Sequence, residues 1–119
     1  MTMYDPERVV MQAASTEKDA SAIEALVLDA LNMAHAGSTM AIGTAEFAFG
    51  WTFYQISVAR SAIRRLGSLP DCDILKVKGD SVEQKFVNWL NGQAKKKGLQ
   101  GRIHFTLAAD LRSSRYGLF

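Results

Sequence analysis

Residues 40–66 read MAIGTAEFAFGWTFYQISVARSAIRRL, the most distinctive apolar pattern in this chain of 119 residues. At about 100° of rotation per residue, the large side chains form two stripes on nearly opposite sides of a helix. One stripe consists of Ile42, Phe49, Phe53, Ile56 and Ile63, and the other of Phe47, Trp51, Tyr54 and Val58. The pattern predicts one long, aromatic-rich helix over Met40–Leu66, followed by Gly67 as the stop signal.

A helix that is apolar on two faces is normally sandwiched between layers or buried in an oligomer. Small residues spaced seven apart lie beside the second stripe, where they permit close approach of another helix: Gly43, Gly50 and Ser57. Three roles stay open for this surface, namely internal core, contact between copies of the chain, and a pocket for an aromatic ligand. The predicted oligomer or ligand face consists of Gly43, Phe47, Gly50, Trp51 and Tyr54.

Two further helices are expected before this stretch. Asp5 is a capping residue followed by proline at the first helical position, which predicts a helix over Pro6–Ala14. Ser15 or Thr16 opens the next helix, whose apolar residues recur at helical spacing until Gly37 stops it.

The periodicity changes after Pro70. Ile74–Lys78 alternates as a strand does, with Leu75 and Val77 on one face. Asp80 or Ser81 then caps a helix with Val82, Phe86, Trp89 and Leu90 as its apolar stripe.

A second alternating segment, Arg102–Leu107, follows that helix. Strand, helix and strand in this order predict a βαβ unit with a parallel pair of strands. Two strands make a thin sheet, so a third is expected either from Arg8–Gln12 in an extended conformation or from a second subunit.

The predicted fold class is therefore α+β: N-terminal helices, including the long aromatic-rich one, packed on a small C-terminal βαβ unit. Residues 1–109 are predicted to form a single domain. Residues 110–119 have no clear period, and we predict a tail that becomes ordered only on a partner.

The composition is that of an ordinary globular chain, with 48% hydrophobic and 22% charged residues. Cys72 is the only cysteine, which excludes an internal disulfide and a thiolate metal cluster. Residues 41–59 carry a single formal charge, but their Gly, Thr, Gln and Ser residues favour a buried helix over a membrane span. We expect no metal, no cofactor and no membrane partner.

The charges are unevenly distributed along the chain. Residues 1–57 carry two basic and seven acidic side chains, whereas residues 58–119 carry twelve basic and five acidic ones. A net charge of only +2 for the whole chain thus hides an acidic N-terminal half and a basic C-terminal half.

If the two C-terminal strands are neighbours, their outward residues bring several basic side chains to one face of the sheet. Such a face contacts phosphates through several cations at once, which predicts salt-dependent binding of nucleic acid. The predicted anion-binding set is Lys76, Lys78, Lys95, Lys96, Lys97, Arg102, His104, Arg112 and Arg115. Two alternatives are ordinary solvated lysines and self-association of the acidic half with the basic half.

We therefore predict a cytoplasmic, homo-oligomeric, non-enzymatic binding or regulatory protein, with nucleic acid or a nucleoprotein as its partner. The alternative is a small inhibitor or sequestering protein that binds a protein or a nucleotide. An enzyme that uses His104 as a general base is left open, although no nucleophile or carboxylate is tied to it by local spacing.

Overall fold

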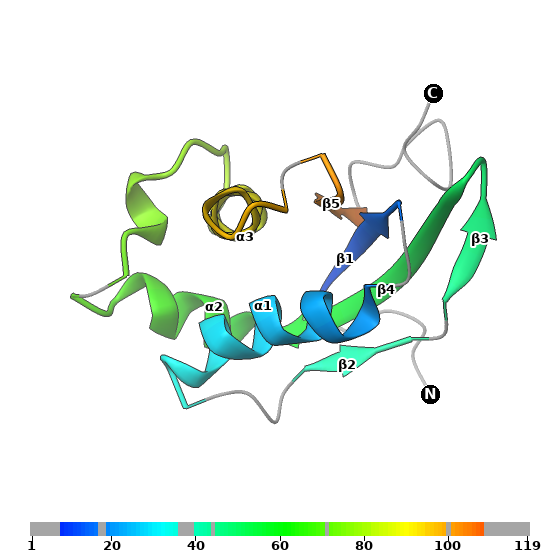
Figure 1. The fold of residues 1–119 in the computed structure, drawn as a ribbon. Helices are drawn as coiled ribbons and strands as arrows, with labels where there is room; N and C mark the ends of the chain where they lie inside the picture. The colour runs from blue at the N-terminus through cyan, green and yellow to red at the C-terminus, as the bar shows by residue number, and fades with distance from the viewer. Residues whose placement is uncertain are drawn as a thin grey trace, which may run out of the picture.

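The computed structural model describes residues 8–16, 19–35, 40–43, 45–70, 72–99 and 101–108. In these residues the chain is mixed α+β, with one sheet and a layer of helices (Figure 1). The elements in chain order are β1 (Arg8–Ser15), α1 (Ala20–Asn32), β2 (Ala41–Ile42), β3 (Glu46–Ala48), β4 (Trp51–Ala59), α2 (Arg60–Gly67), the 3-10 turn η2 (Ile74–Lys76), α3 (Val82–Lys96) and β5 (Ile103–Leu107).

The sheet has the strand order β2-β4-β1-β5, and β3 pairs with β4 on the same edge as β2. Every pairing among these strands is antiparallel, including β1 with β4 and β1 with β5. With β2 and β3 counted as one interrupted strand, this order of elements is the split βαβ arrangement of ferredoxin-like folds.

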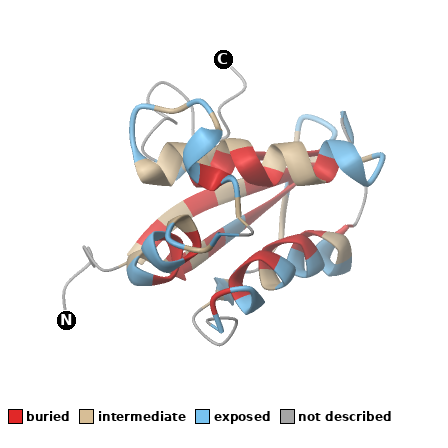
Figure 2. Cartoon of the chain, turned by 90° about the vertical axis from the view of Figure 1, so that its left-hand side faces the viewer, coloured by how far each residue is buried: buried red, intermediate tan, exposed pale blue. Residues whose placement is uncertain are grey.

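The helices cover one face of the sheet, and the core lies between the two layers. Figure 2 shows buried residues on the sides of the helices that face the strands. The core cluster takes alternate residues of the strands, such as Met11, Ile56 and Phe105, together with Leu31 of α1 and Leu90 of α3. The other face of the sheet has no helix over it among the described residues.

The predicted arrangement of N-terminal helices on a C-terminal βαβ unit is wrong. The N-terminal segment is strand β1, which lies between β4 and β5 and pairs with both. Its alternate residues Val9, Met11 and Ala13 are buried in the core, which explains why this segment is extended. The extended alternative for Arg8–Gln12 is thus correct, whereas the parallel strand pair is not found among the described strands.

The long helix predicted over Met40–Leu66 is also wrong. The segment forms β2, β3, β4 and only then a helix, α2, at its end. From Tyr54 to Val58 the burial alternates as in a strand, because Tyr54, Ile56 and Val58 are buried while Gln55 is exposed. Where most residues of a segment are apolar, the helical spacing of some of them does not distinguish a helix from a strand. The aromatic and β-branched residues of this segment favour a strand.

The predicted strand Ile74–Lys78 is replaced by η2 and a loop that folds against α3. The Lys85 ammonium donates hydrogen bonds to the carbonyls of Leu75 and Val77, both at 3.1 Å. Ile74 is fully buried and Leu75 is 55% exposed, so the predicted strand alternation is not found at these two positions. Side-chain hydrogen bonds to this loop thus take the place of a strand ladder.

Three other predictions are confirmed at the level of secondary structure. Helix α1 lies within the second predicted helix, and β5 corresponds to Arg102–Leu107. Helix α3 begins after Ser81, whose hydroxyl accepts a hydrogen bond from the backbone N–H of Gln84 at 3.1 Å. No helix in the described part of the chain is long and apolar enough to cross a membrane.

Candidate anion-binding pocket at the end of the sheet

A cavity of about 510 Å³, here called the end pocket, opens where β4, β5 and α3 come together at one end of the sheet. Its lining residues are Trp51, Asn91, Gly92, Lys95, Gly101, Ile103 and His104. Among the described lining residues there are one cation, one imidazole, one indole and one amide, and no carboxylate. The end pocket therefore has the chemistry to hold an anionic ligand that also carries an aromatic ring.

The end pocket lies just beyond the last residue of β1. The last residue of β1, Ser15, pairs with Thr52 on one side and with Ile103 on the other. Trp51 therefore lies beyond the end of β1. By the alternation of strands, Trp51 and His104 share the face of the sheet that is opposite the helices.

Asn91 attaches α3 to the outer edge of β5. Its side-chain amide donates to the carbonyl of Phe105 at 3.0 Å and accepts from the N–H of Phe105 at 2.8 Å. The side chain thus satisfies backbone groups that an edge strand would otherwise expose. Lys95 follows Asn91 by one helical turn, so the same attachment positions the lysine at the pocket.

Gly92 leaves the wall of the end pocket bare. Glycine in the interior of a helix costs about 1 kcal/mol relative to alanine. A Cβ atom on Gly92 would meet no other atom within 4 Å, so packing does not require the missing side chain. What the glycine does provide is open space in the pocket wall.

Arg102 lies in the chain between two pocket residues, but its guanidinium group pairs with the buried carboxylate of Asp19. Its Nε donates to Oδ2 of Asp19 at 3.0 Å, and its Nη2 donates to Oδ1 of the same carboxylate. Asp19 is only 5% exposed and also accepts a hydrogen bond from the Ser15 hydroxyl. The hydrogen bonds from Arg102 hold the pKa of Asp19 below its ordinary value of 3.8, although burial acts in the opposite direction.

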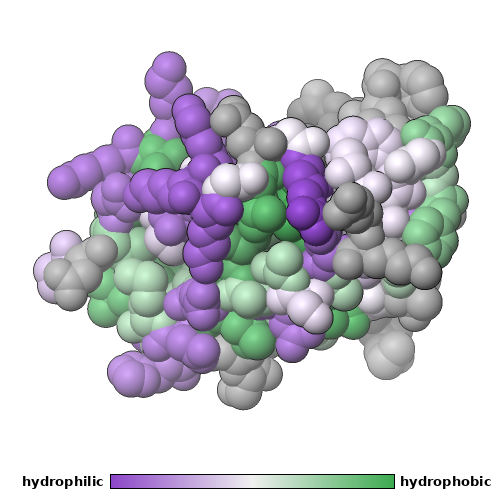
Figure 3. Space-filling view, in the orientation of Figure 1, coloured by the Kyte–Doolittle hydropathy of each residue, from purple (hydrophilic) through white to green (hydrophobic). Residues whose placement is uncertain are grey.

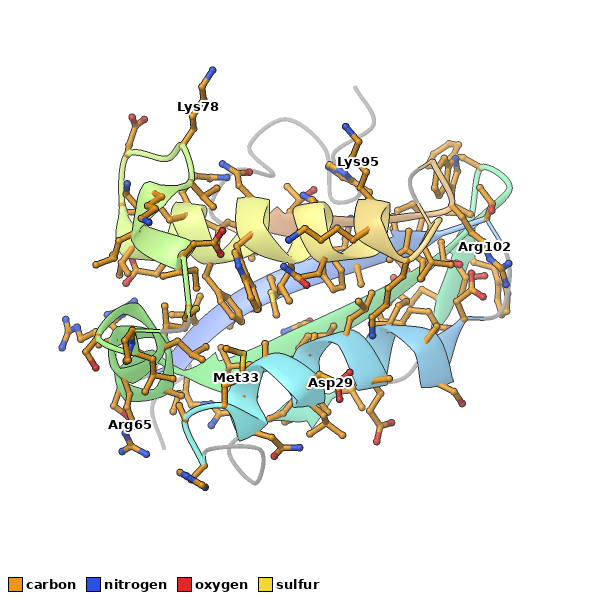
Figure 4. The ribbon with its side chains drawn as sticks, turned by 60° about the vertical axis from the view of Figure 1, so that its left-hand side comes forward. Asp29, Met33, Arg65, Lys78, Lys95 and Arg102 are labelled. Atoms are coloured by element: carbon orange, nitrogen blue, oxygen red, sulfur yellow. The ribbon has the colours of Figure 1, made fainter. Side chains whose placement is uncertain are left out.

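The remaining basic residues of the predicted set do not gather at one pocket of the described structure: Lys95 lines the end pocket, whereas Lys96 and Lys97 do not. Figure 4 shows Lys78 and Lys95 at opposite ends of α3, and Lys76 lies in η2 next to Lys78. Figure 3 shows hydrophilic side chains spread over the side of the molecule that holds η2 and α3. The predicted tail residues Arg112 and Arg115 lie outside the described residues.

Lys96 and Lys97 line a different groove, about 530 Å³, between α1 and α3. Lys97 pairs there with Asp29 at 3.3 Å. Asp73 lines the same groove and accepts a hydrogen bond at 2.9 Å from the Trp89 indole, which lowers the pKa of Asp73. Since carboxylates face these two lysines, this groove is less suited to an anion than the end pocket.

The residues of the predicted oligomer or ligand face also lie in different places in the structure. Tyr54 is buried in the core, whereas Gly50 lies in the turn between β3 and β4. Gly43 lines a cavity of about 620 Å³ on the open face of the sheet, where Glu46 is the charged residue of the lining. Only Trp51 of this set reaches the end pocket.

Sequence reasoning thus named Trp51, Lys95 and His104, but in two separate sets, and it missed Asn91 and Gly92. An isolated glycine inside a helical pattern is a signal that points to Gly92. No local signal points to Asn91, because its partner is the backbone of another element.

Comparison with protein-family models gives no match, and neither curated proteins nor solved structures show significant similarity to this chain. Since a fold alone does not imply a function, the evidence for one is the chemistry of the site. Among the described residues, no cluster of His, Cys, Asp and Glu side chains is suited to hold a metal ion.

Proposed function

We propose that this protein is a non-enzymatic binding protein for single-stranded nucleic acid, which places one nucleotide in the end pocket. The observation that carries the proposal is that Trp51, Lys95 and His104 line one cavity although they come from three different elements. In the pocket Trp51 stacks on a base, Lys95 contacts the phosphate, and His104 hydrogen-bonds to the sugar or phosphate.

The proposed contacts of Trp51 and Lys95 are of kinds whose contribution to binding affinity is known. Stacking of a base on an aromatic side chain contributes about 1–3 kcal/mol, and it tolerates any base because every base has a π face. Contacts between lysine and phosphate add affinity that falls as salt is raised. The volume of about 510 Å³ is typical of a pocket for a small organic group, and one nucleotide is of that class.

A single strand is a better ligand than a duplex. A base can enter a recessed pocket only when it is unstacked and unpaired, as in a single strand or a loop.

The test is the affinity of labelled oligonucleotides, deoxythymidine and uridine decamers, measured by fluorescence anisotropy at low and moderate salt. We expect Lys95→Glu to weaken binding at least tenfold. Lys78→Glu makes the same charge change at the far end of α3 and is the matched control, with an expected loss of less than threefold. Absence of binding by the unaltered protein, or equal losses in the two variants, would exclude the proposal.

Gly92→Leu separates binding from folding. Leucine is a better helix former than glycine, and a Cβ atom at this position meets no neighbouring element within 4 Å, so the thermal midpoint should stay the same or rise. The added side chain enters the end pocket, so affinity for the decamers should fall at least tenfold. If a mononucleotide binds as tightly as a decamer, the nucleotide-sequestering alternative is the better description.

A further inference from the structure

Phe49 lies at the tip of the β3–β4 hairpin and is 63% exposed. Ala48 pairs with Trp51, so Phe49 and Gly50 form a two-residue turn. Both residues have positive φ, 58° for Phe49 and 82° for Gly50, which is the pattern of a type I′ turn. Figure 3 shows hydrophobic surface along this side of the molecule, at the right of the view.

The residue at the first position of this turn is a poor choice for folding. Type I′ turns favour Asn-Gly or Asp-Gly, because asparagine and aspartate tolerate the left-handed conformation. A bulky aromatic residue with φ of 58° is a backbone outlier, and a large exposed apolar side chain adds a second unfavourable feature. Backbone outliers of this kind concentrate at functional sites.

We propose that Phe49 is a second stacking platform for the strand whose neighbouring nucleotide enters the end pocket. This inference rests on the proposed function. Phe49 is two residues from Trp51, so their Cα atoms are at most about 7 Å apart. Neighbouring bases of an extended single strand span a similar distance, so one base stacks on Trp51 and the next on Phe49.

Phe47 provides a matched comparison within the same hairpin. It is exposed to a similar degree, 66%, but it pairs with Thr52 and so lies on the opposite face of the sheet from Trp51. A strand that passes over Trp51 on its own face of the sheet therefore does not contact Phe47.

The experiment measures binding of deoxythymidine oligomers of one to eight nucleotides to the unaltered protein, Phe49→Asn and Phe47→Asn. We expect Phe49→Asn to bind the mononucleotide normally, to lose about tenfold in affinity for the longer oligomers, and to have a raised thermal midpoint. Phe47→Asn should bind all lengths like the unaltered protein. Phe49→Leu, which keeps an apolar side chain without a ring, should lose a similar amount.

The outcomes separate this inference from the proposed function. Normal binding of all lengths by Phe49→Asn, with Lys95→Glu still defective, overturns the second platform and leaves the end pocket. Equal losses in Phe49→Asn and Phe47→Asn also overturn it, because the effect would then be general to exposed apolar surface. Failure of the unaltered protein to bind any oligomer overturns both.

Discussion

Residues 40–66 and the residues that follow the cap at Ser81 are both predicted as helices, and only the second segment, Val82–Lys96, is a helix throughout. The second segment has signals at its ends: Ser81 caps its first turn, Lys95 and Lys96 lie in its last turn, and Gly98 follows. The first segment had an apolar period, and its stop signals at Arg64, Arg65 and Gly67 belong to the short helix α2. Capping and stop residues at the ends of a segment are therefore a more reliable sign of a helix than an apolar periodicity in a segment where most residues are apolar.

The largest effect is expected where β4 buries one residue and exposes the next. Ile56→Ala should lower the free energy of unfolding by about 2–5 kcal/mol, because it leaves a cavity in the core. Gln55→Ala is the control, and its effect should stay within about 0.5 kcal/mol. Urea unfolding measures both values, and similar losses at the two positions would contradict the strand.

An intermediate effect is expected at Asp19, the residue that precedes α1. Unlike Ser81 at α3, Asp19 makes no side-chain hydrogen bond to the first turn of its helix, and its carboxylate binds Arg102 and Ser15 instead. Asp19→Asn should therefore cost about 2 kcal/mol near neutral pH, because it removes the charge that Arg102 faces.

The pairing of Asp19 with Arg102 also predicts how the stability of the protein depends on pH. Because the folded-state pKa of Asp19 is lowered from 3.8, its stabilisation is complete above that value and is lost as pH falls through the lowered pKa. The stability difference between the unaltered protein and Asp19→Asn should thus shrink between pH 5 and about pH 2. A difference that is constant over this range would contradict the charged pair.

The smallest effect is expected at the cap of α3. Ser81→Ala should cost about 1 kcal/mol, since it removes the acceptor for the Gln84 N–H, whereas Ser81→Asp should restore the cap. Thermal unfolding followed by circular dichroism measures both. An alanine variant as stable as the unaltered protein would show that tertiary packing, and not the end signal, holds this helix.

The candidate site was predictable in its parts and not as a whole. Trp51 was assigned to an aromatic face, while Lys95 and His104 were assigned to a basic one. They share a pocket because β1 ends at Ser15 and because Asn91 holds α3 against β5. Both reasons depend on contacts between elements, so no local pattern contains them.

Helices α1 and α3 and strand β5 follow from the order of residues alone, since capping and alternation act within a few neighbouring positions. The central place of β1, the hairpin in residues 46–59 and the neutralisation of Arg102 by Asp19, 83 positions away, follow only from the folded chain. The physical reason is that a strand is stabilised by pairing with distant residues. A segment rich in apolar side chains adopts whichever periodicity its partners in the sheet and core allow.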